Sequence, residues 1–301
     1  MSDTAEPLRE HPSTYFVQDR SSRDEMARLV VQDKMLTAGM GGVLPELTDY
    51  SHLRRVLDVG CGTGGWLMEM ARTYPGIERL VGADISSKKL TYASTRAEAE
   101  RLYDRVRFQT MDALRILEFS PGYFDLVNHR VGASRVRRWE WTKLLSEYQR
   151  VTQPGGIIRI TEMNACIESN SPALTKINNI VLETSYRSGR LFTPSSDGIT
   201  RELAHLMTQH GIQDVQTRVH TVVCRAGTVE GESFYEDMAY GLRGSLPFLQ
   251  KWTNVPSDYS ELCKQVLEEM QRPDFVATWT LLTAWGIKPK NGSPRISMGL
   301  P

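Results

Sequence analysis

The residues best placed to do chemistry form a glycine-rich segment, Asp58-Val-Gly-Cys-Gly-Thr-Gly-Gly65, that directly follows a short apolar run. Glycine lets the backbone approach a ligand closely, and a helix that follows such a turn offers unpaired N–H groups. Gly60, Gly62 and Gly65 satisfy G-x-G-x-x-G, the pattern of dinucleotide-binding turns. Asp58 would repel a pyrophosphate and attract a cationic ligand. A structural glycine turn without a ligand is the plainer alternative.

Two further acids stand at the ends of later apolar segments. Asp84 closes the run that begins at Leu80, about twenty residues after the glycine turn. An acid at this distance can accept hydrogen bonds from both hydroxyls of a ribose. Asp112 follows the run that begins at Val106, and a helix N-cap in front of Ala113 is one possible role for it.

The glycine segment, read as Asp58-Val-Gly-Cys-Gly-Thr-Gly64, resembles the first motif of the class I S-adenosylmethionine (SAM)-dependent methyltransferases. SAM carries an ammonium and a sulfonium, both of which suit a nearby carboxylate. In this family the acid at the position of Asp112 accepts a hydrogen bond from the adenine amine, and its neighbours meet the ring. The resemblance implies that SAM, or its product S-adenosylhomocysteine (SAH), is bound by Asp58, Gly60, Gly62, Gly64, Asp84, Ile85, Met111, Asp112, Ala113 and Asn128.

Strand and helix patterns alternate in the order that would bring these residues together. Strands are predicted at 56–59, 80–85, 106–113, 123–130, 157–162, 215–225 and 278–286. Helices are predicted at 15–40, 65–74, 88–102, 141–151, 174–186, 199–210, 234–242 and 259–270. The resemblance implies an α/β, Rossmann-like fold: a doubly wound sheet of seven strands, mostly parallel, with an antiparallel last strand and helices on both faces.

The predicted organisation places extra segments on both sides of a cofactor-binding core. An N-terminal tail and helical cap cover 1–50, and the SAM-binding core covers 51–163. A helical lid follows at 164–198, then the second half of the sheet at 199–288 with a helical insertion at about 228–274, and a tail at 289–301. The first helix could place Tyr15, Gln32 and the region of Gly41 against a ligand, although plain packing is the alternative for each.

The resemblance further implies methyl transfer to a small molecule, as in ubiquinone/menaquinone biosynthesis and secondary metabolism. C-methylation of a terpenoid, prenylated or aromatic acceptor is favoured and O-methylation is next, with the indole-terpenoid C-methyltransferases as a candidate subgroup. His129 is the first candidate base, because an imidazole titrates near neutral pH, and Glu162 is the second. Methyl transfer to an alkene acceptor would leave a carbocation, which aromatic rings could stabilise by cation–π contacts. The rings available for this are Tyr186, Phe192, Phe234, Tyr235 and Tyr240, and packing is the alternative role for each.

Composition favours a small-molecule enzyme. The 301 residues include 36 basic and 36 acidic side chains, so no net charge draws the chain to nucleic acid or an anionic membrane. The four cysteines are far apart and form no C-x-x-C, which argues against disulfides and a metal site. No apolar run approaches a membrane span, and the polar start is unlike a signal peptide. We expect a cytoplasmic protein and a homo-oligomer through the insertions or the first helix.

Three other functions remain open. An NAD(P)-dependent oxidoreductase is permitted by G-x-G-x-x-G, but Asp58, Asp112 and the lack of a Tyr-x-x-x-Lys pair disfavour it. A non-catalytic subunit with the same fold would have no need to keep the three acids. A nucleic-acid methyltransferase would usually carry an Asn-Pro-Pro-aromatic run after the fourth strand, where this chain reads Val-Asn-His-Arg.

Overall fold

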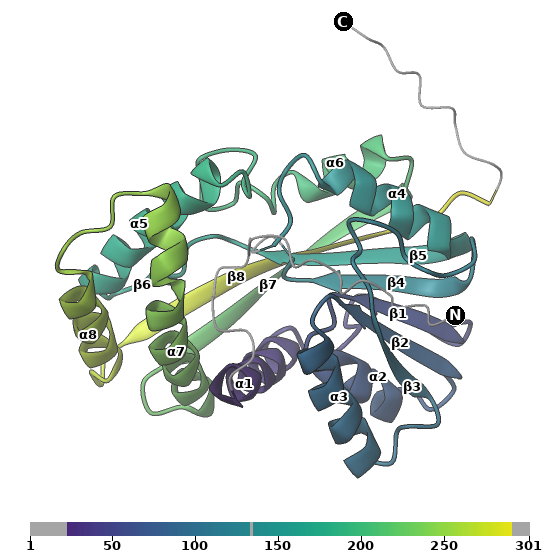
Figure 1. The fold of residues 1–301 in the computed structure, drawn as a ribbon, viewed down its shortest axis with the longest axis horizontal. Helices are drawn as coiled ribbons and strands as arrows, with labels where there is room; N and C mark the ends of the chain where they lie inside the picture. The colour runs from purple at the N-terminus through teal and green to yellow at the C-terminus, as the bar shows by residue number, and fades with distance from the viewer. Residues whose placement is uncertain (1–22, 133–134, 291–301) are drawn as a thin grey trace, which may run out of the picture.

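One central sheet with helices on both sides organises the computed structural model, which describes residues 23–132 and 135–290 (Figure 1). The strands are β1 (Arg55–Val59), β2 (Arg79–Asp84), β3 (Val106–Thr110), β4 (Phe124–Arg130), β5 (Thr152–Met163), β6 (Glu168–Ser169), β7 (Gln213–Arg225) and β8 (Val276–Ile287). The helices are α1 (Arg23–Gly39), α2 (Gly65–Thr73), α3 (Ser87–Ala99), α4 (Trp141–Val151), α5 (Pro172–Arg187), α6 (Leu203–Gln209), α7 (Val229–Trp252) and α8 (Tyr259–Met270).

The sheet has the predicted doubly wound topology. Its order is β3-β2-β1-β4-β5-β8, the first five strands are parallel, and β8 runs antiparallel to both β5 and β7. The prediction of seven strands is one short, because β8 is long enough to pair with a further strand. The two-residue β6 pairs with β8 at Thr278 and Ala277, beyond the end of β5.

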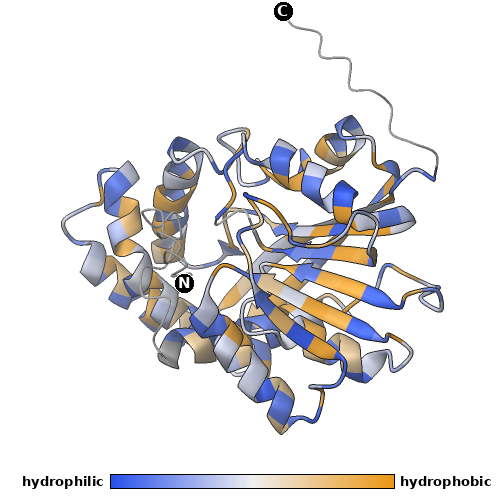
Figure 2. Ribbon diagram, turned by 45° about the vertical axis from the view of Figure 1, so that its right-hand side comes forward, coloured by the Kyte–Doolittle hydropathy of each residue, from blue (hydrophilic) through white to orange (hydrophobic). Residues whose placement is uncertain are grey.

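Three groups of buried apolar side chains hold the layers together. One group lies under α4 and α6, and a second lies under α2 on the opposite face of the sheet. The third joins α1, α5, α7 and α8 to the far ends of β7 and β8, and these helices form a separate group beside the parallel half of the sheet (Figure 1). Figure 2 shows apolar residues in the middle of the parallel strands and hydrophilic residues toward their ends.

Two predicted boundaries are wrong for identifiable reasons. Helix α7 continues to Trp252, although the sequence predicted a loop after residue 242. Pro247 lies inside this helix and cannot donate a backbone hydrogen bond. Its neighbours Phe248 and Leu249 are buried, and their packing outweighs that loss. Strand β5 begins at Thr152 instead of residue 157, and Thr152 pairs with Phe124 before a bulge in the register. Of the predicted helix 15–40, the part before residue 23, including Tyr15, lies outside the described residues.

A row of buried polar side chains crosses the middle of the sheet. Asp58, Asn128 and Arg159 are register partners on β1, β4 and β5. The Asn128 amide donates to Asp58 at 2.8 Å, and Arg159 donates to the Asn128 oxygen at 2.8 Å. Glu46 then accepts from Arg159 at 3.0 and 3.1 Å and lies 3.1 Å from His220 Nε2. Because each buried polar group has a partner, the row can cross an otherwise apolar interior.

Glu46 supplies the charge that balances this row. Burial alone would raise the pKa of the Glu46 carboxyl, but the hydrogen bond with His220 and the charge of Arg159 outweigh it and lower the pKa to about 2. A carboxyl whose pKa falls on folding stabilises the protein above its unfolded pKa of about 4.5. That contribution is lost as the pH falls from there through 2.

We predict that Glu46→Gln lowers the free energy of unfolding by about 3–5 kcal/mol at pH 7, because it leaves the buried Arg159 guanidinium without its counter-charge. Urea unfolding would measure the loss. The difference from the wild type should shrink as the pH falls from 4.5 toward 2. Glu78→Gln is the control, since the Glu78–Arg54 pair is exposed and its removal should change the stability by less than about 1 kcal/mol. Equal losses in the two variants would contradict the prediction.

Candidate functional site

The three predicted acids lie at one edge of the sheet. Strands β1, β2 and β3 are neighbours and parallel, so their carboxyl ends meet on the same side. Asp58 pairs with Gly82, Asp84 is the last residue of β2, and Asp112 lies two residues beyond the end of β3. This is the edge of a doubly wound sheet at which ligands bind.

The glycine segment makes a tight turn between β1 and α2. Gly60, Gly62 and Gly64 have φ values of 72°, 56° and 72°, in the left-handed region that favours glycine. A Cβ atom on Gly64 would meet the Phe108 ring at 2.5 Å, so that position has no room for a side chain. At Gly62 a Cβ would meet nothing within 4 Å, because this part of the turn borders open space. The turn therefore presents bare backbone to a ligand.

Asp58 lies at the inner end of this space. The side chain is buried, accepts a hydrogen bond from Asn128, and borders the cavity described below. Burial raises the pKa of the Asp58 carboxyl to about 7, although Arg130 and the Asn128 hydrogen bond act in the opposite direction. A bound cation would favour the ionised form and lower this pKa.

Asp84 and Ile85 flank the turn on the side of β2. Asp84 accepts backbone hydrogen bonds from Gly62 at 3.0 Å and from Ser86 at 2.9 Å. The guanidinium of Arg135 extends over Gly60, and its Nη1 atom lies 3.6 Å from Asp84 Oδ2. Ile85 is 49% exposed, which leaves an apolar surface beside the acid on which a flat ring could pack.

The third acid has a local role in the structure. Asp112 Oδ1 accepts from the Leu114 backbone at 3.0 Å, and Arg115 lies 3.7 Å from its other oxygen. Residues 113–115 form a turn and no helix begins there, so Asp112 caps a turn instead of a helix. Met111 is nearly buried, and Ala113 is partly exposed. The assignment of all three to the adenine stays a prediction.

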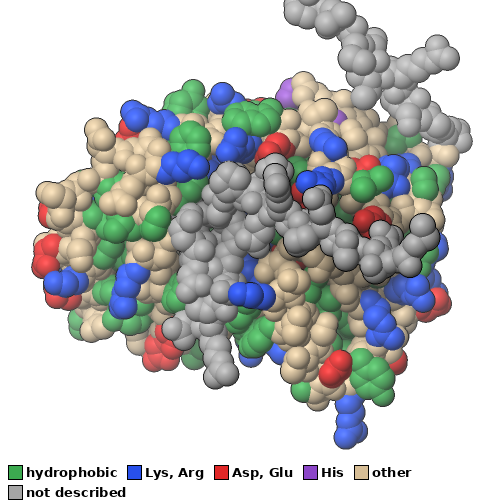
Figure 3. Space-filling view, in the orientation of Figure 1, with side chains coloured by type: hydrophobic (Ala, Val, Ile, Leu, Met, Phe, Trp, Pro, Cys, Tyr) green, Lys and Arg blue, Asp and Glu red, His purple; other side chains and the backbone are tan. Residues whose placement is uncertain are grey.

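A cavity of about 340 Å³ runs from the glycine turn to the space between α1, α5 and α7. Gly60, Gly62 and Asp58 border one end. The rest is mostly apolar and is lined by Leu29, Leu36, Val131, Met163, Ala165, Ile167, Leu174, Ile177, Val181, Leu191, Ile199, Met238, Leu242 and Trp279. On the face drawn in Figure 3, basic and acidic side chains are interspersed, as the balanced composition leads one to expect.

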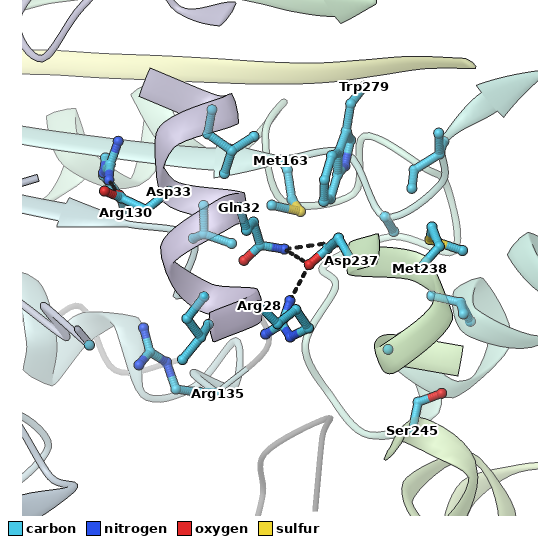
Figure 4. Close-up of a pocket in the computed structure, with 18 of the residues that line it drawn as sticks. Arg28, Gln32, Asp33, Arg130, Arg135, Met163, Asp237, Met238, Ser245 and Trp279 are labelled. Atoms are coloured by element: carbon cyan, nitrogen blue, oxygen red, sulfur yellow. Dashed lines mark hydrogen bonds and ion pairs between the residues drawn. The ribbon is translucent and has the colours of Figure 1, made fainter. Parts of the chain in front are cut away.

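Charged side chains on α1 tie the two ends of the cavity together (Figure 4). Arg28 donates to Asp237 of α7 at 2.5 Å, and Gln32 donates to the same carboxylate at 3.1 and 3.2 Å. The next residue along α1, Asp33, pairs with Arg130 at the end of β4. Gln32, for which both a ligand contact and plain packing were open, lines the cavity. Sequence reasoning missed Arg28 and Asp237, which are 209 residues apart and share no local pattern.

His129 and Glu162 lie behind the cavity wall. His129 is buried, its Nδ1 bonds to the hydroxyl of Tyr148, and its Nε2 is 3.6 Å from Glu162. Glu162 accepts from the Gly132 backbone at 2.8 Å. Burial, reinforced by the charge of Arg135, lowers the pKa of His129 to about 3, so the imidazole is neutral at pH 7. Neither side chain borders the cavity, and their catalytic role stays a prediction.

The five aromatic residues for which both a carbocation contact and plain packing were open do not border the cavity, which favours packing. Phe234 packs in the core, with its ring 6.0 Å from that of Trp279. Trp279 on β8 does line the cavity and was overlooked. Its strand alternates buried and partly exposed residues, and this period could have placed the indole on the inner face. Of three arginines that follow β4, Arg135 reaches the cavity, whereas Arg137 and Arg138 stand over the exposed ring of Trp139.

The described residues hold no cluster of His, Cys, Asp and Glu suited to a metal ion, and the four cysteines are unpaired. In the same part of the chain, no helix combines the length and apolarity needed to cross a bilayer.

Known proteins share both the motif region and the fold. A family model described as a methyltransferase domain matches residues 56–156. The demethylmenaquinone methyltransferase of Thermus thermophilus is 38% identical over 109 residues, which are 36% of this chain and 47% of that protein. The chloroplastic tocopherol O-methyltransferase of Arabidopsis thaliana is 29% identical over 205 residues, 68% of this chain and 55% of that protein. The chain thus spans about half the length of these relatives.

Among solved structures, a phosphoethanolamine N-methyltransferase 2 of Haemonchus contortus, in complex with SAH, superposes with a TM-score of 0.55. It is 21% identical and covers 93% of this chain and 61% of its own, a likeness that shows the fold. With the domain match over residues 56–156, it supports the class I methyltransferase fold that the resemblance in the glycine segment predicted.

We predict that the affinity for SAH depends on the ionisation of Asp58. Below pH 7 the carboxyl becomes neutral and loses its attraction for the ammonium of SAH, so binding should be about tenfold weaker at pH 6 than at pH 8. Asp58→Asn should bind weakly at both pH values. Because the pKa of Asp58 rises on folding, its ionised form lowers stability, and the variant should unfold at a higher temperature than the wild type at pH 8.

Titration calorimetry at the two pH values and thermal unfolding measure these effects. Asp49→Asn is the control, because Asp49 is exposed and lies outside the cavity lining. Retention of the wild-type pH dependence in Asp58→Asn would show that another group controls binding.

Proposed function

We propose that the protein transfers a methyl group from SAM to a predominantly apolar small molecule. The observation that supports this most is the continuity of the cavity. One space borders the bare glycine turn and Asp58 at one end and an apolar wall from three helices at the other. A donor and an acceptor held in such a space would meet without water between them, and alignment of two reactants supplies much of the catalysis of a bimolecular step.

The residues at the glycine end fit the donor. Asp58 would hold the ammonium, and the backbone of Gly60, Gly62 and Gly64 would follow the chain that joins it to the ribose. Asp84 still has lone pairs for the ribose hydroxyls beside its two backbone hydrogen bonds. The half-exposed Ile85 would pack on the adenine, whose edge would be met by Met111, Asp112 and Ala113. When bound, SAM supplies an electrophilic methyl group on a sulfonium.

The far end fits an acceptor with a large apolar part. Fourteen apolar side chains line it, and the ring of Trp279 offers a face on which a flat or unsaturated molecule can stack. The relatives named for demethylmenaquinone and tocopherol support an aromatic acceptor of this kind. C-methylation of an aromatic, prenylated or terpenoid acceptor is our first choice and O-methylation the second. We also propose that the protein acts in secondary metabolism, that it is cytoplasmic and that it forms a homo-oligomer.

The residues of the chain mainly position the two reactants and exclude water from the space between them. A new bond forms between the acceptor and the methyl carbon while the bond between the methyl carbon and sulfur breaks. The electron pair of the broken bond stays on sulfur. The acceptor then loses a proton, for which His129 and Glu162 were predicted as bases. Their place behind Gly132 and the low pKa of His129 favour support of the cavity wall over direct proton transfer.

We predict that the purified protein transfers labelled methyl from SAM to an apolar phenol or hydroquinone, and that it binds SAH but not NAD. Asp84→Ala should weaken SAH binding at least tenfold, because the ribose loses its acceptor and the Gly62 turn loses its support. Mass spectrometry of the product would distinguish a C-methyl from an O-methyl group.

Asp104→Ala is the matched control, since this exposed acid lies in the loop before β3 and outside the cavity lining. Tight binding of NAD without any response to SAH would contradict the proposal.

We also predict that His129→Ala lowers the unfolding temperature but reduces turnover by less than tenfold. Loss of a true general base would cost about 10²–10⁴-fold. The variant leaves the Tyr148 hydroxyl without its partner in the core, so the defect should appear in thermal unfolding. The pH dependence of the rate checks the assignment: a limb present in the wild type and absent from His129→Ala would restore His129 as the base.

A further inference from the structure

Val131 has a backbone conformation that its side chain disfavours. It follows the last residue of β4 and has a φ of 53°. In the described parts of the chain, Arg101 and Asp214 are the other non-glycine residues with positive φ, at 58° and 51°. A β-branched side chain in this region is a genuine outlier, whereas an aspartate is tolerated more easily. Of the three, only Val131 lines the cavity.

Three contacts hold the chain in this conformation. The Val131 N–H donates to the Thr161 carbonyl at 2.8 Å, and the next N–H, of Gly132, donates to the Glu162 carboxylate at 2.8 Å. A Cβ atom on Gly132 would collide with the imidazole of His129, so the backbone lies directly against that ring. The buried pair of His129 and Glu162 therefore fixes the turn from behind the cavity wall.

The side chain stands where the two ends of the cavity join. Its neighbour Arg130 pairs with Asp33 near the glycine turn, while Val131 itself packs against the apolar group under α5 and α7. Strain of this kind persists only where the surroundings over-determine it, and it concentrates at ligand-binding sites. A glycine would adopt this backbone conformation without strain, so the presence of a valine that lines the cavity points to a role for its side chain there.

We propose that Val131 is a specificity-determining residue that limits the width of the acceptor at this junction. The proposal rests on the methyltransferase function proposed above. Removal of the side chain should widen the acceptor end and leave the donor end, formed by the glycine turn and Asp58, as it is.

Thermal unfolding tests the backbone strain by comparing the unfolding temperatures of a glycine and an alanine variant. At an ordinary position, a protein with glycine is less stable than the same protein with alanine, because glycine loses more backbone entropy on folding. At Val131 the order should reverse, and Val131→Gly should unfold at a higher temperature than Val131→Ala. Val181, which lines the same cavity from α5, is the matched control and should show the ordinary order.

Binding tests the specificity, with 1-naphthol and the bulkier 2-methyl-1-naphthol as probes for calorimetry on the SAH-bound protein. Both Val131 variants should shift the affinity ratio toward the bulkier probe by at least about fivefold, since one methyl group in an apolar pocket changes binding by tenfold or more. The affinity for SAH should stay within twofold of the wild type. Arg101→Gly, which relieves a positive φ far from the cavity, should leave the ratio unchanged.

The outcomes separate the two proposals. If the wild type does not bind SAH, the proposed function fails. If SAH binds but the probe ratio does not respond to Val131, or neither naphthol binds any variant, the role of Val131 is overturned. The ordinary order of stability at Val131 would overturn the strain on which it rests.

Discussion

The structure depends on the neutralisation of charge inside the sheet. Asp58 stands at the inner end of the ligand cavity, yet it is shielded from water, and its carboxyl is held by an amide whose orientation is set by Arg159. That arginine needs Glu46, which lies in the loop before β1 and also meets His220 on β7. The acid at the site is thus supported by residues from three other strands and a loop. The cation site proposed at Asp58 would therefore depend on contacts across much of the sheet.

Local sequence was sufficient for the parallel half of the fold. The glycine segment between an apolar strand and a helix predicted the turn, and the spacing to Asp84 and Asp112 placed both acids at the same edge of the sheet. These features succeed because strand order and right-handed crossovers leave little freedom once the strands are identified. The helix α4 was predicted at its observed bounds, since its apolar residues recur at a clear helical period.

The acceptor end of the site was harder to predict. Arg28 and Asp237 form a hydrogen bond although they are 209 residues apart in the sequence, and no periodic pattern or motif links the two positions. His129 looked like a base because its residue type and strand position suit one. Only the packing of Gly132 and Tyr148 around the ring shows that it is buried behind the wall. The aromatic residues were predicted by type alone, and the burial of Phe234 depends on how α7 packs on β8.

The position of α1 has a consequence for the order of events. This helix lies over the glycine turn through Asp33 and is fastened to α7 through Arg28 and Gln32, so it forms part of the wall at both ends of the cavity. A displacement of α1 would therefore break contacts at both ends of the cavity. If the cavity holds the proposed donor and acceptor, α1 couples the binding of one to the binding of the other.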